Sequence, residues 1–493
     1  MRSGLLTLLI AMTIRLPLQA NTKSTFVGID GRDRTSAEID ATVTHVMQGA
    51  EVPGLALGLI NHGRIAYLKA YGVKNMSPNE PLTVNSVMVG ASLTKVAFAY
   101  LVMKLVDDHV IDLDKPVYEY LTRPLSDYPA WRDIANDPRS KLITTRMLLS
   151  HTAGFNNARY FDPEHRLVIH FQPGTQYSYG SEGYNLLQLV VETLTRKSTE
   201  ELMQERVFRP LGMTRTSMVW QSAFESDHAN GYDEYGRSLG IQKRKTAQGA
   251  GSMQTTITDY ARLTQAVLLG RGLRKETHAQ MLSVQIPIVS KFEFPPLLPD
   301  TTDEYKGIQL SYGLGVGLYH TPYGWAFFKE GHDEGWRTYV VCHQNQATCM
   351  VILTNSSNGE GIYSALLRGL LGDTWNPIDW EVLTPYDKLP PRKPLSDHTR
   401  IQVPAFLAML AGRYGTQNDV LTVEAEGDHL SIVEDGKPKR EFFPHTWRIF
   451  FSKDSDETLT FLFDIDTWAF RILREAGGKD ELIPNLEWAH PAP

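Results

Sequence analysis

The chain has 493 residues, of which 42% are hydrophobic and 21% charged, and its formal net charge at pH 7 is −7. This length predicts two or three domains, and the composition is that of a globular protein. The negative charge argues against nucleic acid as a partner, because a nucleic-acid interface requires a basic face.

Residues 1–20 have the pattern of a secretory signal peptide. Arg2 provides a positive charge, Leu5 to Ile14 form a short apolar stretch, and Ala20 is a suitable cleavage position. The apolar stretch is too short to span a bilayer as a helix, so no stable transmembrane anchor is expected. The pattern therefore predicts an exported protein, either periplasmic or secreted.

Residues 30–376 alternate between helical and strand patterns. A helix is predicted over residues 36–50, and the next two strands meet at an Asn-His-Gly turn, residues 61–63. Further helices are predicted at residues 144–154, 183–197, 198–212, 256–272 and 359–372. Strands return at residues 315–320, 324–330, 335–342 and 349–355. This order predicts an α+β domain whose sheet combines strands from both ends of the segment.

The sequence changes character after this domain. Proline density and mixed charge predict a linker over residues 377–404. Short alternating runs follow, separated by turns rich in Gly, Asp and Asn. They predict a small all-β, barrel-like domain over residues 405–485.

The two cysteines, Cys342 and Cys349, flank a polar turn centred on Asn345 and Gln346. They are expected to face each other across a hairpin. A disulfide would suit an exported protein, but two unbridged core residues are slightly favoured because a directly opposed pair often strains the bridge. No Cys-x-x-Cys or His-Glu-x-x-His spacing occurs, so neither a metal nor a cofactor is expected.

A polar quartet from Ser92 to Lys95 opens a helix that is otherwise apolar on nearly every side. Such a helix belongs in a core. Ser92 could be its N-cap, but that role does not explain Lys95, which lies on the same face three residues on. A buried lysine is costly unless it is paired or loses its proton, and a neutral lysine can activate a serine hydroxyl.

Two other segments offer partners for this pair. Lys329 and Gly331 lie two apart on a predicted strand, where a second cation would lower the pKa of the helix lysine and the glycine would let a substrate approach. Tyr179 lies in a Gly-rich turn and could serve as a second acid or base. Taken singly, Lys329 would be an exposed edge lysine and Tyr179 a packing residue, with Tyr177 and Tyr184 as competitors.

These segments together resemble the penicillin-recognising serine hydrolases of the class C β-lactamase type. That family includes DD-peptidases, D-amino-acid peptidases, esterases and lactamases. The resemblance covers about residues 35–375. The resemblance implies a β-lactamase/transpeptidase-like fold, an antiparallel sheet flanked by helices plus a helical region. The segments that carry it, in order, are VPGLALGLINHG, GASLTK, MLLSHTAGF, PGTQYSYGSEGYNLL, VFRPLGMTRTSM, GAGSMQTTITDYARL and KEGHDEGWRTYVV.

The resemblance implies roles for individual residues. Ser92 matches the acylated nucleophile, Lys95 its proton partner and Tyr179 the tyrosine of the Tyr-x-Asn motif. Lys329 matches the lysine of Lys-Thr-Gly, which helps to bind a substrate carboxylate. The backbone N–H groups of Ser92 and His332 would form the oxyanion hole. The His-Thr-Ala-Gly-Phe segment that begins at residue 151 resembles a family landmark and is interpreted as structural.

Two positions depart from the family pattern. Ser181 stands where an asparagine normally contributes to substrate binding, and Glu330 replaces the threonine between Lys329 and Gly331. A carboxylate there would weaken recognition of a substrate carboxylate, although strand alternation predicts that Glu330 points away from the site. Both changes favour a peptidase or an esterase over an efficient β-lactamase.

The sequence thus predicts acyl transfer to Ser92 followed by attack of water. Which of Lys95 and Tyr179 is the base in each half is left open, because a coupled pair can share a proton. A D-amino-acid peptidase and a carboxylesterase are nearly equal alternatives, each acting on a small-molecule or peptide substrate. A true β-lactamase ranks third, and a non-catalytic penicillin- or muropeptide-binding protein is the competing class.

Overall fold

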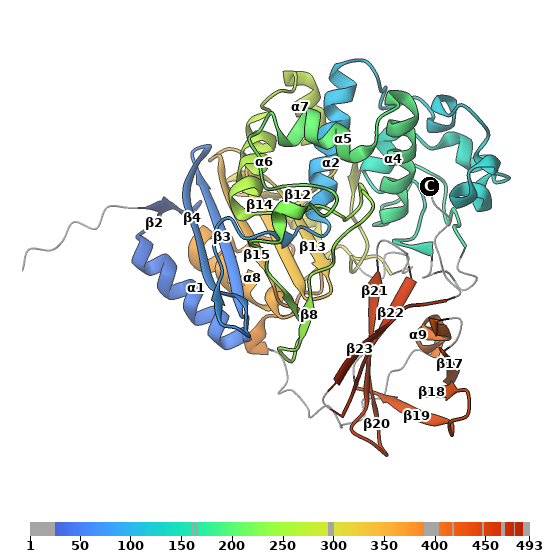
Figure 1. Ribbon diagram of the computed structural model, residues 1–493. Coiled ribbons are helices and arrows are strands. Elements are labelled where there is room, and N and C mark those ends of the chain that lie inside the picture. The colour runs from blue at the N-terminus through green and yellow to red at the C-terminus, as the bar shows by residue number, and fades with distance from the viewer. Residues whose placement is uncertain are drawn as a thin grey trace, which may run out of the picture.

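The structure is a computed structural model that describes residues 25–159, 162, 166–293, 300–388, 404–416, 419–445, 448–464, 469–477 and 479–486. The predicted signal peptide, residues 1–20, lies outside the described residues, as do residues 389–403 of the predicted linker. None of the described helices has the length and apolar character needed to cross a bilayer. The chain forms a mixed helix-and-sheet domain followed by an all-β unit, which confirms the predicted fold class (Figure 1).

A nine-stranded antiparallel sheet forms the centre of the first domain, in the order β10-β11-β12-β13-β14-β15-β3-β4-β5. Strand β3, from the N-terminal part of the domain, pairs with β15 from its C-terminal part, as predicted. The strands are β3 (Gly54–Asn61), β4 (Arg64–Asn75), β5 (Glu80–Pro81), β10 (Ile286–Pro287), β11 (Ser311–Tyr312), β12 (Gly317–Thr321), β13 (Gly324–Asp333), β14 (Trp336–His343) and β15 (Thr348–Thr354).

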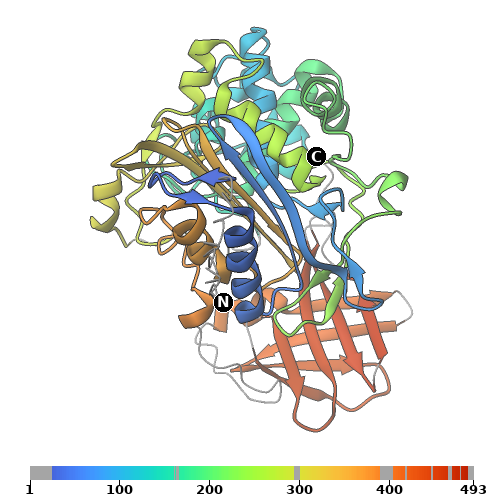
Figure 2. The same cartoon turned by 90° about the vertical axis from the view of Figure 1, so that its left-hand side faces the viewer.

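Helices cover both faces of this sheet (Figures 1 and 2). Helices α2 (Leu93–Asp107) and α6 (Ile257–Leu269) pack on one face, and α1 (Ser36–Ala50) and α8 (Tyr363–Leu366) lie on the other. The remaining described α-helices of this domain are α3 (Thr145–Leu149), α4 (Ser181–Thr195), α5 (Thr199–Met203) and α7 (Lys275–Met281). Short paired strands complete it: β1 (Phe26–Val27), β2 (Asp33–Arg34), β6 (Met88–Val89), β7 (Gly231–Tyr232), β8 (Ser238–Gly240) and β9 (Gln254–Thr255).

The β14–β15 hairpin carries the two cysteines. Cys342 and Cys349 are directly opposed in its register, as the sequence predicts. Their sulfur atoms are bonded, so the slightly favoured interpretation as two unbridged core residues is corrected. Both residues are fully buried, and their Cα atoms are 4.1 Å apart. The close approach of opposed residues in the hairpin, which made the bridge the less favoured choice, is what brings the two sulfur atoms together.

The predicted linker begins later than its proline content indicates. Ile378 and Trp380 are buried in the same core as α1, so this stretch belongs structurally to the first domain. The physical reason is burial of apolar side chains, which outweighs the extended preference of the neighbouring prolines. The same turn carries Glu381 into the interior, where it is 4% exposed.

The C-terminal unit is an eight-stranded antiparallel sheet with strand order β16 to β23. Its first and last strands meet, because the Gly415 N–H donates to the Pro484 carbonyl (2.7 Å) and the Leu486 N–H to the Arg413 carbonyl (2.8 Å). A barrel closed in this way leaves few free strand edges. The elements are α9 (Pro404–Leu410), β16 (Gly412–Thr416), β17 (Asp419–Glu426), β18 (His429–Glu434), β19 (Arg440–Pro444), β20 (Ile449–Ser452), β21 (Thr458–Asp464), β22 (Ala469–Ala476) and β23 (Lys479–Ile483).

The barrel contacts the first domain through charged side chains. Arg448, which is 3% exposed, pairs with Glu234 and Glu334, and its guanidinium lies 3.3 Å from the Ser357 hydroxyl. Glu334 belongs to the turn between β13 and β14. The barrel is therefore in contact with the hairpin whose first strand carries Lys329.

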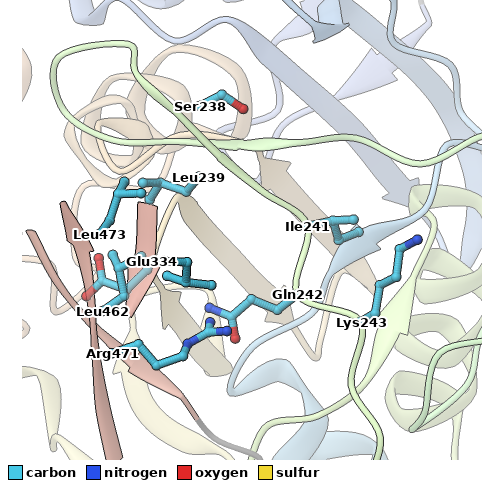
Figure 3. A pocket seen from close by; sticks show the side chains of 10 residues that line it. Ser238, Leu239, Ile241, Gln242, Lys243, Glu334, Leu462, Arg471 and Leu473 are labelled. Carbon is cyan, nitrogen blue, oxygen red and sulfur yellow. The ribbon is translucent and has the colours of Figure 1, made fainter. Parts of the chain in front are cut away.

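A cavity of about 320 Å³ lies at this contact. Figure 3 shows the chain around Ser238 and Gln242 on one side, the barrel residues Leu462 and Leu473 on the other, and Glu334 between them. Neither Ser92 nor Lys95 lines this cavity, which lies on the barrel side of the hairpin turn.

Candidate active site

Ser92 lies at the N-terminal end of α2 but does not cap it. Its side chain accepts no capping hydrogen bond from the backbone of the first turn. The preceding Ala91 has φ of 45°, a left-handed conformation that costs free energy for a residue with a side chain. Instead, Ser92 Oγ lies 3.0 Å from Lys95 Nζ and 2.9 Å from the Tyr179 hydroxyl. The local backbone thus directs the serine hydroxyl toward two possible proton carriers.

Lys95 is fully buried at the start of the same helix. Besides Ser92, its amine lies 2.7 Å from the Ala250 carbonyl and 3.2 Å from the Ser181 hydroxyl. None of these neighbours is a carboxylate. Burial, followed by repulsion from Lys329, lowers the pKa of Lys95 well below the usual lysine value. A lysine with such a pKa can be neutral and accept a proton, as the sequence predicts.

Tyr179 lies between two lysines. Its ring centre is 5.0 Å from Lys95 Nζ and 4.4 Å from Lys329 Nζ. Burial raises the pKa of the Tyr179 hydroxyl, and the opposing effect of Lys329 is smaller. The hydroxyl is therefore a neutral phenol in the free protein. It is placed to donate a proton, while Lys95 is placed to accept one.

His151 holds this tyrosine in place, a contact that the sequence did not indicate. The Gly180 N–H donates to His151 Nδ1 at 3.2 Å, and the His151 and Tyr179 rings lie 4.6 Å apart. Burial, followed by repulsion from Lys95, lowers the pKa of His151 well below its usual value. A neutral imidazole packed in this way is a positioning residue, in agreement with its structural interpretation from sequence.

Ser181 also lies in this site, where its hydroxyl connects two side chains. It donates to Asn157 Oδ1 at 2.9 Å and lies 3.2 Å from Lys95 Nζ. Its role in binding substrate stays a prediction, because both of these contacts are made within the protein. Asn157 was missed by the sequence analysis, since it lies in an irregular loop and belongs to none of the matched motifs.

Strand β13 passes directly beside the serine. Its neighbour β12 pairs with it only as far as Phe328, so one edge of the strand from Lys329 onward is unpaired among the strands that the structure describes. A Cβ atom added to Gly331 would lie 3.2 Å from Ser92 N. The structure therefore brings Lys329 and Gly331 to the site. The backbone N–H of His332 follows on this strand, and its part in an oxyanion hole stays a prediction.

Replacement of Gly331 by alanine is expected to reduce kcat/KM for an activated ester about 100-fold, the size of effect seen when one oxyanion donor is removed. The new methyl group would overlap with Thr338 Oγ1 on β14 and lie 3.1 Å from the Gly90 carbonyl, so β13 must shift relative to these neighbours. Gly307→Ala is the control, because its added Cβ would meet no atom within 4 Å. Full activity in Gly331→Ala would contradict the placement of β13 beside the acylated group.

Glu330 does not point away from the site, contrary to the prediction from strand alternation. Its carboxylate contacts the Lys329 amine, although the two residues are adjacent on β13. Alternation places the Cβ atoms of adjacent residues on opposite faces of a strand, but two long side chains can still meet around an edge that no strand covers. Here the edge beyond β12 is unpaired, which leaves room for both side chains to turn toward it.

Two further glutamates lie at this ion pair. Oxygen atoms of Glu293, Glu330 and Glu381 all lie within 4.8 Å of one another. Glu381 accepts a hydrogen bond from the Tyr339 hydroxyl at 2.9 Å. The other oxygen of Glu381 and Oε2 of Glu293 find no hydrogen-bond partner among the residues that the structure describes. Burial, followed by the charge of Glu330, raises the pKa of both buried glutamates.

This group of three carboxylates has the spacing to hold a metal ion. The ammonium group of Lys329 already supplies a positive charge at Glu330, so Lys329 and the three glutamates form an ion-pair cluster. No sequence motif marks this cluster, because Glu293 and Glu381 lie in irregular segments almost ninety residues apart.

Comparison with known proteins gives the family of the chain. A family model described as Beta-lactamase matches residues 39–371. Penicillin-binding protein 4 of Amycolatopsis lactamdurans is 26% identical over 341 residues, which cover 65% of this chain and 86% of that protein. D-aminopeptidase of Brucella anthropi is 26% identical over 206 residues, 40% of this chain and 39% of that protein. Protein flp of Staphylococcus aureus is 24% identical and also matches over less than half of its length, 43%.

Solved structures share the fold. An octameric penicillin-binding protein homologue from Pyrococcus abyssi aligns over 92% of this chain and 98% of its own, with a TM-score of 0.56 and 20% identity. D-alanine carboxypeptidase AmpC from Burkholderia cenocepacia aligns over 68% of this chain and 96% of its own, with a TM-score of 0.55 and 18% identity. The first alignment includes the barrel, and together they confirm a penicillin-binding-protein-like fold.

Proposed function

Because the chain belongs to the beta-lactamase family, we propose that it is a serine hydrolase that forms an acyl-enzyme at Ser92. The observation that carries this proposal is the position of Ser92 Oγ, 3.0 Å from a buried lysine amine and 2.9 Å from a tyrosine hydroxyl. A serine hydroxyl requires an adjacent base to become a nucleophile, and Lys95 is the group in this site that can accept its proton.

Acylation begins when Lys95 Nζ takes the proton of Ser92 Oγ as the oxygen attacks the substrate carbonyl carbon. The carbonyl oxygen becomes an oxyanion, which the positive end of α2 and the backbone N–H groups of Ser92 and His332 stabilise. When the tetrahedral intermediate collapses, the bond to the leaving group breaks and Tyr179 donates the proton that this group requires. The Lys95 ammonium then returns a proton to Tyr179.

Deacylation reverses this sequence with water as the nucleophile. Water attacks the ester carbon and gives one proton to the Lys95–Tyr179 pair. The bond to Ser92 Oγ then breaks, and the same proton returns to the serine. The products are a free acid and the regenerated hydroxyl, so no cofactor enters the balance.

The substrate proposed is a peptide or amide containing a D-amino acid, or a carboxylic ester. The D-aminopeptidase from Brucella anthropi supports the first class, although the match spans 39% of its length. The changes at Ser181 and Glu330 disfavour a true β-lactamase, which is the alternative together with a non-catalytic penicillin- or muropeptide-binding protein. Export is part of this proposal, and the bridged cysteines support it because disulfides persist in oxidising compartments.

The test is the intact mass of the protein after incubation with a p-nitrophenyl ester or with benzylpenicillin, quenched in acid, with hydrolysis followed in parallel. We expect ester turnover, an acyl adduct on the peptide that contains Ser92, and penicillin left largely intact. A lasting penicillin adduct would indicate a penicillin-binding peptidase, and rapid loss of penicillin would indicate a β-lactamase. Neither an adduct nor turnover of either compound would support the non-catalytic alternative.

A further inference from the structure

The amine of Lys329 faces the site but is already paired. Lys329 is 1% exposed, and its Nζ contacts the carboxylate of Glu330. In the family pattern, this lysine helps to bind a substrate carboxylate. A carboxylate from the substrate would here have to compete with one that the protein holds permanently in place.

Two more glutamates lie close to Glu330 in the protein interior. Glu293 and Glu381 are 2% and 4% exposed, and their oxygen atoms lie within 4.8 Å of those of Glu330. One ammonium group therefore faces three carboxyl groups. Burial, followed by the charge of Glu330, raises the pKa of Glu293 and Glu381, so the negative charge of the cluster lies chiefly on Glu330. A substrate carboxylate beside Glu330 would enter a region of low dielectric constant where repulsion between like charges is strong.

We propose that Glu330 is a specificity-determining residue, which occupies the Lys329 amine and directs this site toward substrates that carry no carboxylate at the position facing Lys329. This inference rests on the proposed function and names the substrate class for it. Peptide amides, esters and the interior bonds of longer peptides belong to this class. Penicillins and peptides that end in a free carboxylate at that position do not.

The geometry also predicts that replacing Glu330 alone is not enough to free the lysine. Glu293 lies in the same cluster, and the charge of Glu330 contributes to its raised pKa, so Glu293 can ionise and pair with Lys329 once Glu330 is removed. The informative variant is therefore Glu330→Thr combined with Glu293→Gln. It restores the threonine of the family pattern and replaces the second carboxylate by a neutral group of similar shape.

The experiment compares a charged thioester with a neutral counterpart: an N-acylglycyl thioester of thioglycolic acid, and the methyl ester of the same compound. We measure kcat/KM for both with the wild-type protein, Glu330→Thr and the double variant. The wild type is expected to prefer the methyl ester at least about tenfold. Because the double variant leaves Lys329 without a competing carboxylate from Glu330 or Glu293, it should shift the ratio toward the acid at least about tenfold, which corresponds to about 1.4 kcal/mol. Glu330→Thr alone should shift the ratio less.

A binding measurement keeps this inference separate from the proposed function. Calorimetric titration of both compounds into Ser92→Ala protein, with and without the double replacement, reports the same preference without turnover. If neither thioester is hydrolysed but the binding ratio shifts, the proposed function falls and the role of Glu330 stands. A wild-type preference for the acid, or a ratio that changes less than twofold in the double variant, overturns the inference.

Discussion

Ser92→Ala protein is expected to lose acyl-enzyme formation completely and to hydrolyse a p-nitrophenyl ester at least about 10⁴-fold more slowly than the wild type. This factor corresponds to about 5 kcal/mol of transition-state stabilisation. The reason is the position of Ser92 Oγ, which lies within 3.0 Å of both Lys95 Nζ and the Tyr179 hydroxyl. The nearby Ser181 hydroxyl donates its hydrogen bond to Asn157 instead. Intact-mass spectrometry of acid-quenched samples measures acyl-enzyme formation, and initial rates measure ester hydrolysis.

The fold should survive this replacement, because the Ser92 side chain does not cap α2. Circular dichroism and the thermal midpoint should match those of the wild type. Ser126→Ala, a change at an exposed serine, is the control and should label normally. Ester hydrolysis that persists at the wild-type rate in Ser92→Ala would show that another residue is the nucleophile.

Lys95→Met is expected to lower the rate of acylation by about 10³-fold, within the range measured for loss of a general base. Methionine fills much of the same buried volume, so the packing around α2 is largely kept. Single-turnover kinetics with an excess of enzyme isolate acylation from the later steps. Lys104→Met is the matched control, since Lys104 lies on the same helix but its amine contacts the Gly272 carbonyl, away from Ser92.

The pH dependence of the wild type follows from the same lysine. Lys95 must be neutral to accept the proton, and its pKa lies well below the usual value because of burial and then Lys329. The rate of acylation should therefore fall as the pH is lowered through this depressed pKa, and it should level off at a pH where an ordinary lysine is still charged. This fall in rate at low pH should be absent from the residual activity of Lys95→Met. A wild-type profile that rises only near pH 10.5 would contradict a neutral Lys95.

Several features of the molecule were predictable because they depend on local patterns. The apolar run after Lys95 predicts a buried helix, and the Asn61–Gly63 turn predicts the hairpin of β3 and β4, as the structure has them. Alternating polar and apolar residues separated by turns identified the C-terminal barrel for the same reason. A serine and a lysine three residues apart on one helix are brought together by helical geometry alone, so the centre of the site was also within reach of the sequence.

The surroundings of that centre were decided by tertiary structure. The side chain of Glu330 turns toward Lys329 because β12 ends opposite Phe328 and leaves one edge of β13 unpaired, a fact about the extent of a neighbouring strand. The positions of Glu293 and Glu381 depend on irregular segments that fold back from distant parts of the chain, and no motif marks them. The sequence by itself determined that Ser92 and Lys95 lie side by side, because residues three apart share one face of a helix. The carboxylates around Lys329 were instead placed by long-range contacts, which no local pattern encodes.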